Sequence, residues 1–279
     1  MHPRASSFFD ERVTYHDHNV VAAEIRPVFT EAKPHLVIST VRGGSFDIQK
    51  EIIDCAVECG VPRFMPSEFG QDSLNEKVQK RLPPSRERAR IVEYLRELSQ
   101  DGKISWAAVA TGVDLDRGLL NGTLGFNLKW ESATLHGRGY EKFAASSSGW
   151  IGQAVVAIVD KWEQVENQYL YAAGTVTSAD DIIAVIERAV GKTFEVGRGE
   201  VDECVREAAK RIDQGYPDAG MFLYGRSVLY DQTLNATRPF KSDDAKNNLG
   251  LESQKLEDLI DSVLHQHRHH GGGIDCGCN

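Results

Sequence analysis

The sequence has no segment that could span a membrane and no pattern that would direct the chain out of the cell. No apolar run approaches the roughly 20 residues that a membrane-spanning helix needs. Residues 1–10 also lack the apolar centre of a signal peptide. These absences predict a cytoplasmic protein with no membrane partner.

The chain has fewer basic residues than acidic ones. The chain has 32 lysine and arginine residues against 41 aspartate and glutamate residues, so its formal net charge is −9. Attraction between basic side chains and phosphates supplies most non-specific binding to nucleic acid, and this chain would repel phosphates on average. The composition therefore disfavours nucleic acid as a partner.

Cysteines are few and irregularly spaced. Five occur, an odd number with no small-scaffold spacing, which excludes a disulfide framework. Cys55 and Cys59 fall four residues apart in an apolar-periodic segment, so they share a helix face and are interpreted as packing residues.

The carboxyl-terminal end is rich in histidine and glycine. The run from His265 to His270, followed by Cys276 and Cys278, contains residue types that suit zinc or copper. Their spacing matches no structural zinc pattern, and glycines separate the two groups. We therefore predict no metal site, and a disordered tail over residues 266–279.

The first half of the chain alternates between strand and helix patterns. The 279 residues are 41% apolar and 26% charged, enough for a sizeable core. Strands are expected at 12–16, 35–41, 61–66 and 104–110, with helices at 20–31, 45–59 and 86–99 between them. This order predicts an α/β fold with a doubly wound parallel sheet over residues 11–125.

The second half is less regular. Glycine-rich and aromatic stretches at 118–130 and 137–150 give way to helices at 151–165, 178–191, 201–212 and 253–265, with short strands at 169–172 and 193–196. We expect residues 126–265 to form a smaller α+β lobe, interwoven with the first domain, that binds the substrate.

The loop after the third expected strand is the best site candidate. Residues 61–66 read as a buried strand that stops at Pro66, and Ser67 and Glu68 follow it. In open α/β sheets, ligands bind just outside the carboxyl ends of the strands. The same residues are also typical of a helix start, where serine caps the helix and acidic residues follow. Both interpretations stay open at this point.

Several motifs resemble a known family. They are Ile38–Val41, Gly43–Phe46, Arg63–Gly70, Val92–Leu95 and Thr111–Gly112. Together, between about residues 13 and 264, they resemble the NmrA-like and isoflavone-reductase-like family of atypical short-chain dehydrogenases, in its fungal branch. The resemblance implies a Rossmann-like sheet and NADP(H) as cofactor.

The resemblance also implies site residues. Phe69 would lie near the nicotinamide, and Thr111 and Gly112 would lie near the substrate. The residues expected along the cofactor are Thr40, Val41, Gly43, Ser67, Glu68 and Phe69.

Two parts of the family pattern differ here. The sequence has no G-x-G-x-x-G between a strand and a helix, and its first strand resembles the family's third. We therefore expect a sheet truncated at its amino-terminal side, lacking a βαβ unit that upstream coding sequence would supply, or else a different mode of ligand binding. The family's catalytic lysine is replaced by Arg88, which cannot readily release a proton.

The sequence predicts an NADP(H)-dependent reductase that acts on an aromatic or other secondary metabolite in a fungal pathway. Arg88 is the candidate catalytic residue, as an anchor for an anionic group, unless it simply lies on the solvated face of its helix. The alternatives are a non-catalytic, dinucleotide-sensing regulator with a protein partner, which loss of the lysine favours, and a nonfunctional fragment.

Overall fold

The computed structural model describes residues 13–14, 21–41 and 45–269. Gly43, most of the strand expected at 12–16 and the tail from residue 270 lie outside the described residues. No helix in the described part is long and apolar enough to cross a membrane.

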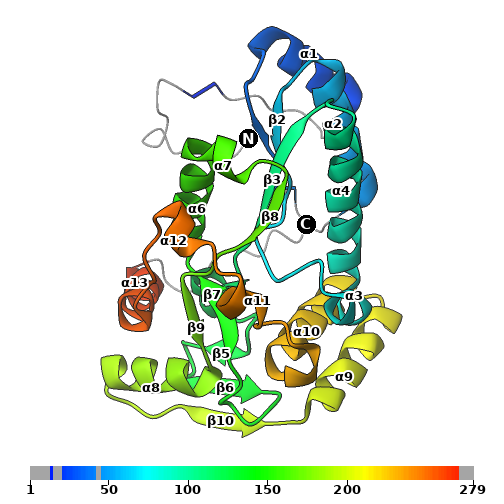
Figure 1. The fold of residues 1–279 in the computed structure, drawn as a ribbon. Helices are drawn as coiled ribbons and strands as arrows, with labels where there is room; N and C mark the ends of the chain where they lie inside the picture. The colour runs from blue at the N-terminus through cyan, green and yellow to red at the C-terminus, as the bar shows by residue number, and fades with distance from the viewer. Residues whose placement is uncertain (1–12, 15–20, 42–44, 270–279) are drawn as a thin grey trace.

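A parallel sheet of four strands forms the first layer of the fold (Figure 1). Its strands are β1 (Val37–Ile38), β2 (Arg63–Met65), β3 (Ser105–Ala110) and β8 (Gln168–Tyr171), in that order across the sheet. Every neighbouring pair runs parallel. The predicted α/β fold with a parallel sheet is confirmed.

Helices cover both faces of this sheet (Figure 1). On one face, Phe64 and Trp106 pack against α2 (Phe46–Glu58) and α4 (Pro83–Gln100), with α1 (Ala22–Ala32) beside them. On the other face, Met65 and Val109 pack against α6 (Ser148–Asp160) and α7 (Trp162–Val165). Because helices cover both faces of the sheet, the strands are continuous apolar runs rather than alternating patterns of apolar and polar residues.

Two small sheets build the second part of the molecule. One contains β5 (Phe126–Asn127), β6 (Ser132–Leu135) and β10 (Glu195–Arg198), and the other contains β4 (Val113–Asp114), β7 (Phe143–Ser146) and β9 (Thr175–Thr177). They share a core with α5 (Leu115–Leu120), α8 (Ala179–Val190) and α13 (Leu256–His269). Ser178 and Asp181 form the expected capping box at the start of α8.

The remaining helices are α3 (Glu76–Arg81), α9 (Val201–Asp213), α10 (Pro217–Tyr230), a 3₁₀ turn η2 (Gln232–Leu234), α11 (Pro239–Ser242) and α12 (Lys246–Leu249). In Figure 1, α9 and α10 lie below the carboxyl edge of the main sheet, whereas α12 lies beside the sheet near α6. The sequence analysis assigned nothing to α10, because its two glycines weaken the apolar stripe.

Helix α1 corresponds to the helix expected at 20–31 and contains Pro27. Two expectations about element boundaries were wrong. Strand β1 has two residues rather than the seven expected at 35–41, since it pairs only with β2. Helix α13 continues to His269, so the predicted tail is incorrect for 266–269, where basic groups suit the end of a helix.

Gly112 marks a close approach between the two parts of the chain. Its φ is +74°, and a Cβ there would lie 2.3 Å from the carbonyl carbon and oxygen of Ala144 in β7. A side chain at position 112 would therefore push β4, which follows this residue, away from β7, which faces it.

We predict that Gly112→Ala destabilises the fold by more than about 3 kcal/mol, because strain in φ adds to a backbone clash. Gly102→Ala is the matched control, since Gly102 has φ +67° but nothing within 4 Å of the added Cβ. It should cost only about 1–2 kcal/mol. Urea unfolding of both variants measures the difference, and equal costs would contradict the clash.

Candidate functional site

A loop of tight turns follows β2 at the carboxyl edge of the main sheet. Within it, Glu68 N–H donates to the carbonyl of Pro66 at 2.8 Å. The carbonyl of Gly70 accepts hydrogen bonds from the N–H groups of both Thr111 and Gly112, each at 2.9 Å. The structure thus places the candidate cofactor loop directly beside the candidate substrate residues that follow β3.

Glu68 is fully buried in this loop. Its Oε2 accepts hydrogen bonds from Ser73 Oγ at 2.7 Å and from Tyr169 OH at 3.1 Å. Its Oε1 has no hydrogen-bond partner among the described residues. Burial raises the pKa of Glu68 to about 7, although the charge of Arg88 and the two hydrogen bonds act in the opposite direction.

Arg88 projects from α4 toward the same loop. It is half-buried, and its Nη1 lies 3.4 Å from the position that a Cβ on Gly70 would occupy. Its Nε is buried and makes no hydrogen bond within the described part of the chain. The interpretation of Arg88 as a residue of the solvated helix face is therefore wrong; that face carries Arg86 and Arg90 instead.

Buried polar atoms without partners gather at the ends of β1, β2 and β3. Ser39 Oγ, Gln49 Nε2 and Thr111 Oγ1 join Glu68 Oε1 in making no hydrogen bond to any described residue. Gln49 holds the loop in place, because its Oε1 accepts from Ser67 N–H at 3.0 Å. Buried polar atoms nearly always have partners, so this group makes the edge of the sheet a candidate site for a polar ligand.

The remaining predicted residues lie around this edge. Thr40 is exposed and Val41 half-buried, directly after β1, whose end is next to that of β2. Ser67 is half-buried, and Phe69 packs partly into the apolar cluster on the α6 side of the sheet. Gly43 lies outside the described residues.

Sequence reasoning missed the partners of this loop. Tyr169 and Tyr171 come from β8, about 100 residues further along the chain, and Tyr171 OH donates to Asp72 Oδ1 at 3.2 Å. Burial raises the pKa of Asp72 as well. The alternation of the two tyrosines in one strand was the available signal, since it places both side chains on one face of the sheet.

A parallel sheet with helices on both faces and polar groups at the carboxyl ends of its strands defines a Rossmann-like fold. The NmrA-like family model matches residues 22–220, and the chain belongs to this family. The resemblance seen in the sequence is confirmed.

Relatives in sequence are fungal proteins. The chain is 32% identical to the oxidoreductase aprR of Aspergillus flavus, over 93% of this chain and 87% of that protein. It is 22% identical to the oxidoreductase poxI of Penicillium oxalicum, over 81% of this chain and 73% of that protein.

Solved structures of plant reductases share the fold. The complex of leucoanthocyanidin reductase from Vitis vinifera with NADPH superposes with a TM-score of 0.70 at 17% identity, covering 88% of this chain and 80% of that one. An isoflavone reductase gives a TM-score of 0.62 at 18% identity, covering 86% and 79%.

The raised pKa of Glu68 predicts a pH-dependent stability. The pKa of Glu68 is near 4.5 in the unfolded chain and about 7 in the folded protein, so the folded state binds the proton more tightly. The stability that this proton contributes is therefore lost as the pH rises from near 4.5 to about 7. The loss amounts to about 3 kcal/mol at 1.36 kcal/mol per pKa unit.

We expect the free energy of unfolding of the wild type, relative to that of Glu68→Gln, to fall by about 3 kcal/mol between pH 5 and pH 8. Denaturant unfolding at several pH values measures it. Glu97→Gln, at an exposed glutamate, is the control and should show a constant difference. A constant difference for Glu68→Gln too would show that Glu68 ionises normally.

Proposed function

We propose that this protein is an NADP(H)-dependent oxidoreductase that reduces an aromatic or other secondary metabolite in a fungal pathway. The observation that carries the proposal is the group of buried polar atoms from Ser39, Gln49, Glu68 and Thr111 that make no hydrogen bond to any described residue, at one edge of a parallel sheet. Family membership, the oxidoreductase relatives and the NADPH complexes among the structural neighbours support it.

The described residues fit one half of a dinucleotide. Thr40 and Val41 after β1, with Ser67, Glu68 and Phe69 after β2, would hold the nicotinamide half, where unpartnered polar atoms and a largely apolar wall meet. The sequence contains no G-x-G-x-x-G between a strand and a helix to hold the pyrophosphate. The bound cofactor would supply the hydride.

The chain's own residues would orient the reactants and manage charge. Glu68, with its pKa of about 7, takes up a proton as the pH falls through about 7, while its Oε2 accepts hydrogen bonds from Ser73 and Tyr169. Arg88 keeps a permanent positive charge beside the loop and cannot act as a general acid, so its role is to anchor an anionic group. Thr111 and Gly112 would contact the substrate.

The alternative is a non-catalytic regulator that senses the dinucleotide and binds another protein. The observation that favours it is Arg88, at a position where the reductases that this chain resembles carry a lysine. Such a protein would bind NADPH but would not oxidise it in the presence of any small-molecule acceptor.

The absence of a G-x-G-x-x-G motif predicts weak cofactor binding. We expect this chain to bind NADPH with a dissociation constant above about 1 μM, because no helix N-terminus follows such a motif to hold the pyrophosphate. Fluorescence titration measures the affinity. Sub-micromolar binding would show that other residues supply the missing contacts.

Variants at position 88 separate anchoring from proton donation. If Arg88 anchors an anion, Arg88→Lys and Arg88→Ala should each raise the Michaelis constant about tenfold, because a lysine cannot reproduce the planar fork. NADPH oxidation over a panel of aromatic ketones and enones measures this.

Arg86→Lys and Arg86→Ala, at an exposed position on the same helix, are the matched controls and should leave the kinetics unchanged. A higher kcat in Arg88→Lys would instead assign position 88 to proton donation. Absence of turnover in the wild type with the whole panel would favour the regulator.

A further inference from the structure

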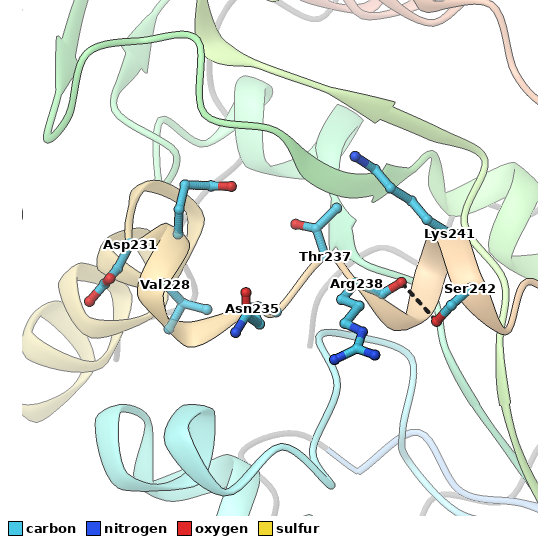
Figure 2. Close-up of a pocket in the computed structure, with 9 residues that line it drawn as sticks. Val228, Asp231, Asn235, Thr237, Arg238, Lys241 and Ser242 are labelled. Carbon is cyan, nitrogen blue, oxygen red and sulfur yellow. Dashed lines mark hydrogen bonds between the residues drawn. The ribbon is translucent and has the colours of Figure 1, made fainter.

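A second cleft lies between α10 and α11. It has a volume of about 510 Å³, and its lining includes Asp231, Asn235, Thr237, Arg238 and Lys241. Figure 2 shows Val228 and Asp231 on the helical turn at one end of the cleft, and Arg238, Lys241 and Ser242 on the turn at the other. We call it the Arg238–Lys241 cleft.

The walls of this cleft are fixed by hydrogen bonds to two other segments. Thr237 Oγ1 donates to the carbonyl of Lys142, just before β7, at 2.8 Å. From the segment at the start of α3, Asn75 Nδ2 donates to the carbonyl of Leu234 at 2.9 Å, and Lys77 Nζ donates to that of Thr233 at 2.8 Å. The segment that carries the lining residues is thus held from both sides.

The cleft carries uncompensated positive charge. Its acidic residue, Asp231, already forms an ion pair with Arg81 at 2.8 Å, and both side chains are largely buried. Arg238 and Lys241 are exposed, and neither side chain forms an ion pair or hydrogen bond within the described part of the chain. Two free cations therefore face one cleft of a protein whose net charge is −9.

The two cations suit an anionic ligand. They stand three residues apart, Arg238 just before the short helix α11 and Lys241 within it, and both line the cleft. A guanidinium fork binds a carboxylate or a phosphate through two parallel hydrogen bonds, and an ammonium adds a point charge.

We propose that the Arg238–Lys241 cleft is a binding site for a small organic anion that carries a carboxylate or phosphate group. Arg238 and Lys241 bind the anionic group, while Asn235 and Thr237 offer polar contacts to hydroxyl groups of the ligand. Val228 and Ala236 supply an apolar wall for its carbon skeleton.

The neighbouring cleft has the opposite charge. It shares Asp231 and Gln232 but is otherwise lined by Glu141, Glu200, Asp202 and Glu203, against the two arginines Arg138 and Arg206. An anion that reaches this side of the molecule is therefore repelled by one cleft and attracted by the other, since a cleft concentrates the field of its own charges.

The Arg238–Lys241 cleft is connected to the candidate site through aromatic rings. Phe240 lies between its two cations in sequence and packs edge-on against Tyr171, with ring centroids 5.8 Å apart. Tyr171 in turn donates to Asp72 in the loop of Glu68. None of the residues that line the cleft is a predicted cofactor or substrate residue.

The test compares a double variant, Arg238→Gln with Lys241→Gln, with a control, Lys80→Gln with Lys255→Gln. Both remove two positive charges, but the control changes exposed lysines outside the cleft. Calorimetric titration of the full chain with glucose 6-phosphate, inorganic phosphate and citrate supplies the phosphate and carboxylate probes, and glucose is the neutral reference.

We expect saturable binding of at least one of the anions, with a dissociation constant below about 1 mM. The double variant should bind that anion at least tenfold more weakly, whereas the control should bind it as the wild type does. Tighter binding of glucose 6-phosphate or of citrate identifies the phosphate or the carboxylate as the natural group.

Three results would overturn the proposal. They are no saturable binding of any probe by the wild type, an equal loss of affinity in both double variants, and an affinity for NADPH that falls in the cleft variant together with that for the anion. The last would make the cleft part of the cofactor site. Unchanged NADPH binding keeps this proposal independent of the proposed oxidoreductase activity.

Discussion

The carbonyl of Gly70 is the point on which the candidate site depends. By accepting from Thr111 and Gly112 together, it ties the loop after β2 to the chain that leaves β3. Each such bond contributes only about 1 kcal/mol net, but the two remove the freedom of a loop that would otherwise expose Glu68. The position of Gly112 against Ala144 extends the same connection into β7.

Burying Glu68 is costly, and the surroundings offset part of the cost. Ser73 and Tyr169 donate to one carboxyl oxygen, and Arg88 supplies a positive charge close by. The second oxygen makes no such bond to the described residues. Natural proteins keep incompletely satisfied groups mainly where function requires them, which is why the edge of the sheet rather than the larger surface clefts is the better candidate for the chemistry.

The sequence predicted what depends on local pattern and missed what depends on distant contacts. Helix α4 and strand β3 were found because their apolar spacing is regular, and the loop at Glu68 was found from its place after a buried strand. The orientation of Arg88 toward Gly70 could not be predicted, since charged residues surround it in the sequence. The link between Glu68 and Tyr169 spans 101 residues and exists only once β8 has joined the sheet.

The path of the chain sets how this molecule can move. Strand β8 returns to the main sheet after the chain has already built β4 to β7, and β9 then leaves it again. Later, Ala245 and Leu249 pack under the main sheet before α13 closes the core of the other part. Two domains can rotate about a hinge only when few chain segments connect them. Here the chain crosses repeatedly between the two parts, so no such hinge exists among the described residues. Ligands must therefore be admitted by local shifts of loops and side chains, and the two parts should unfold as one cooperative unit.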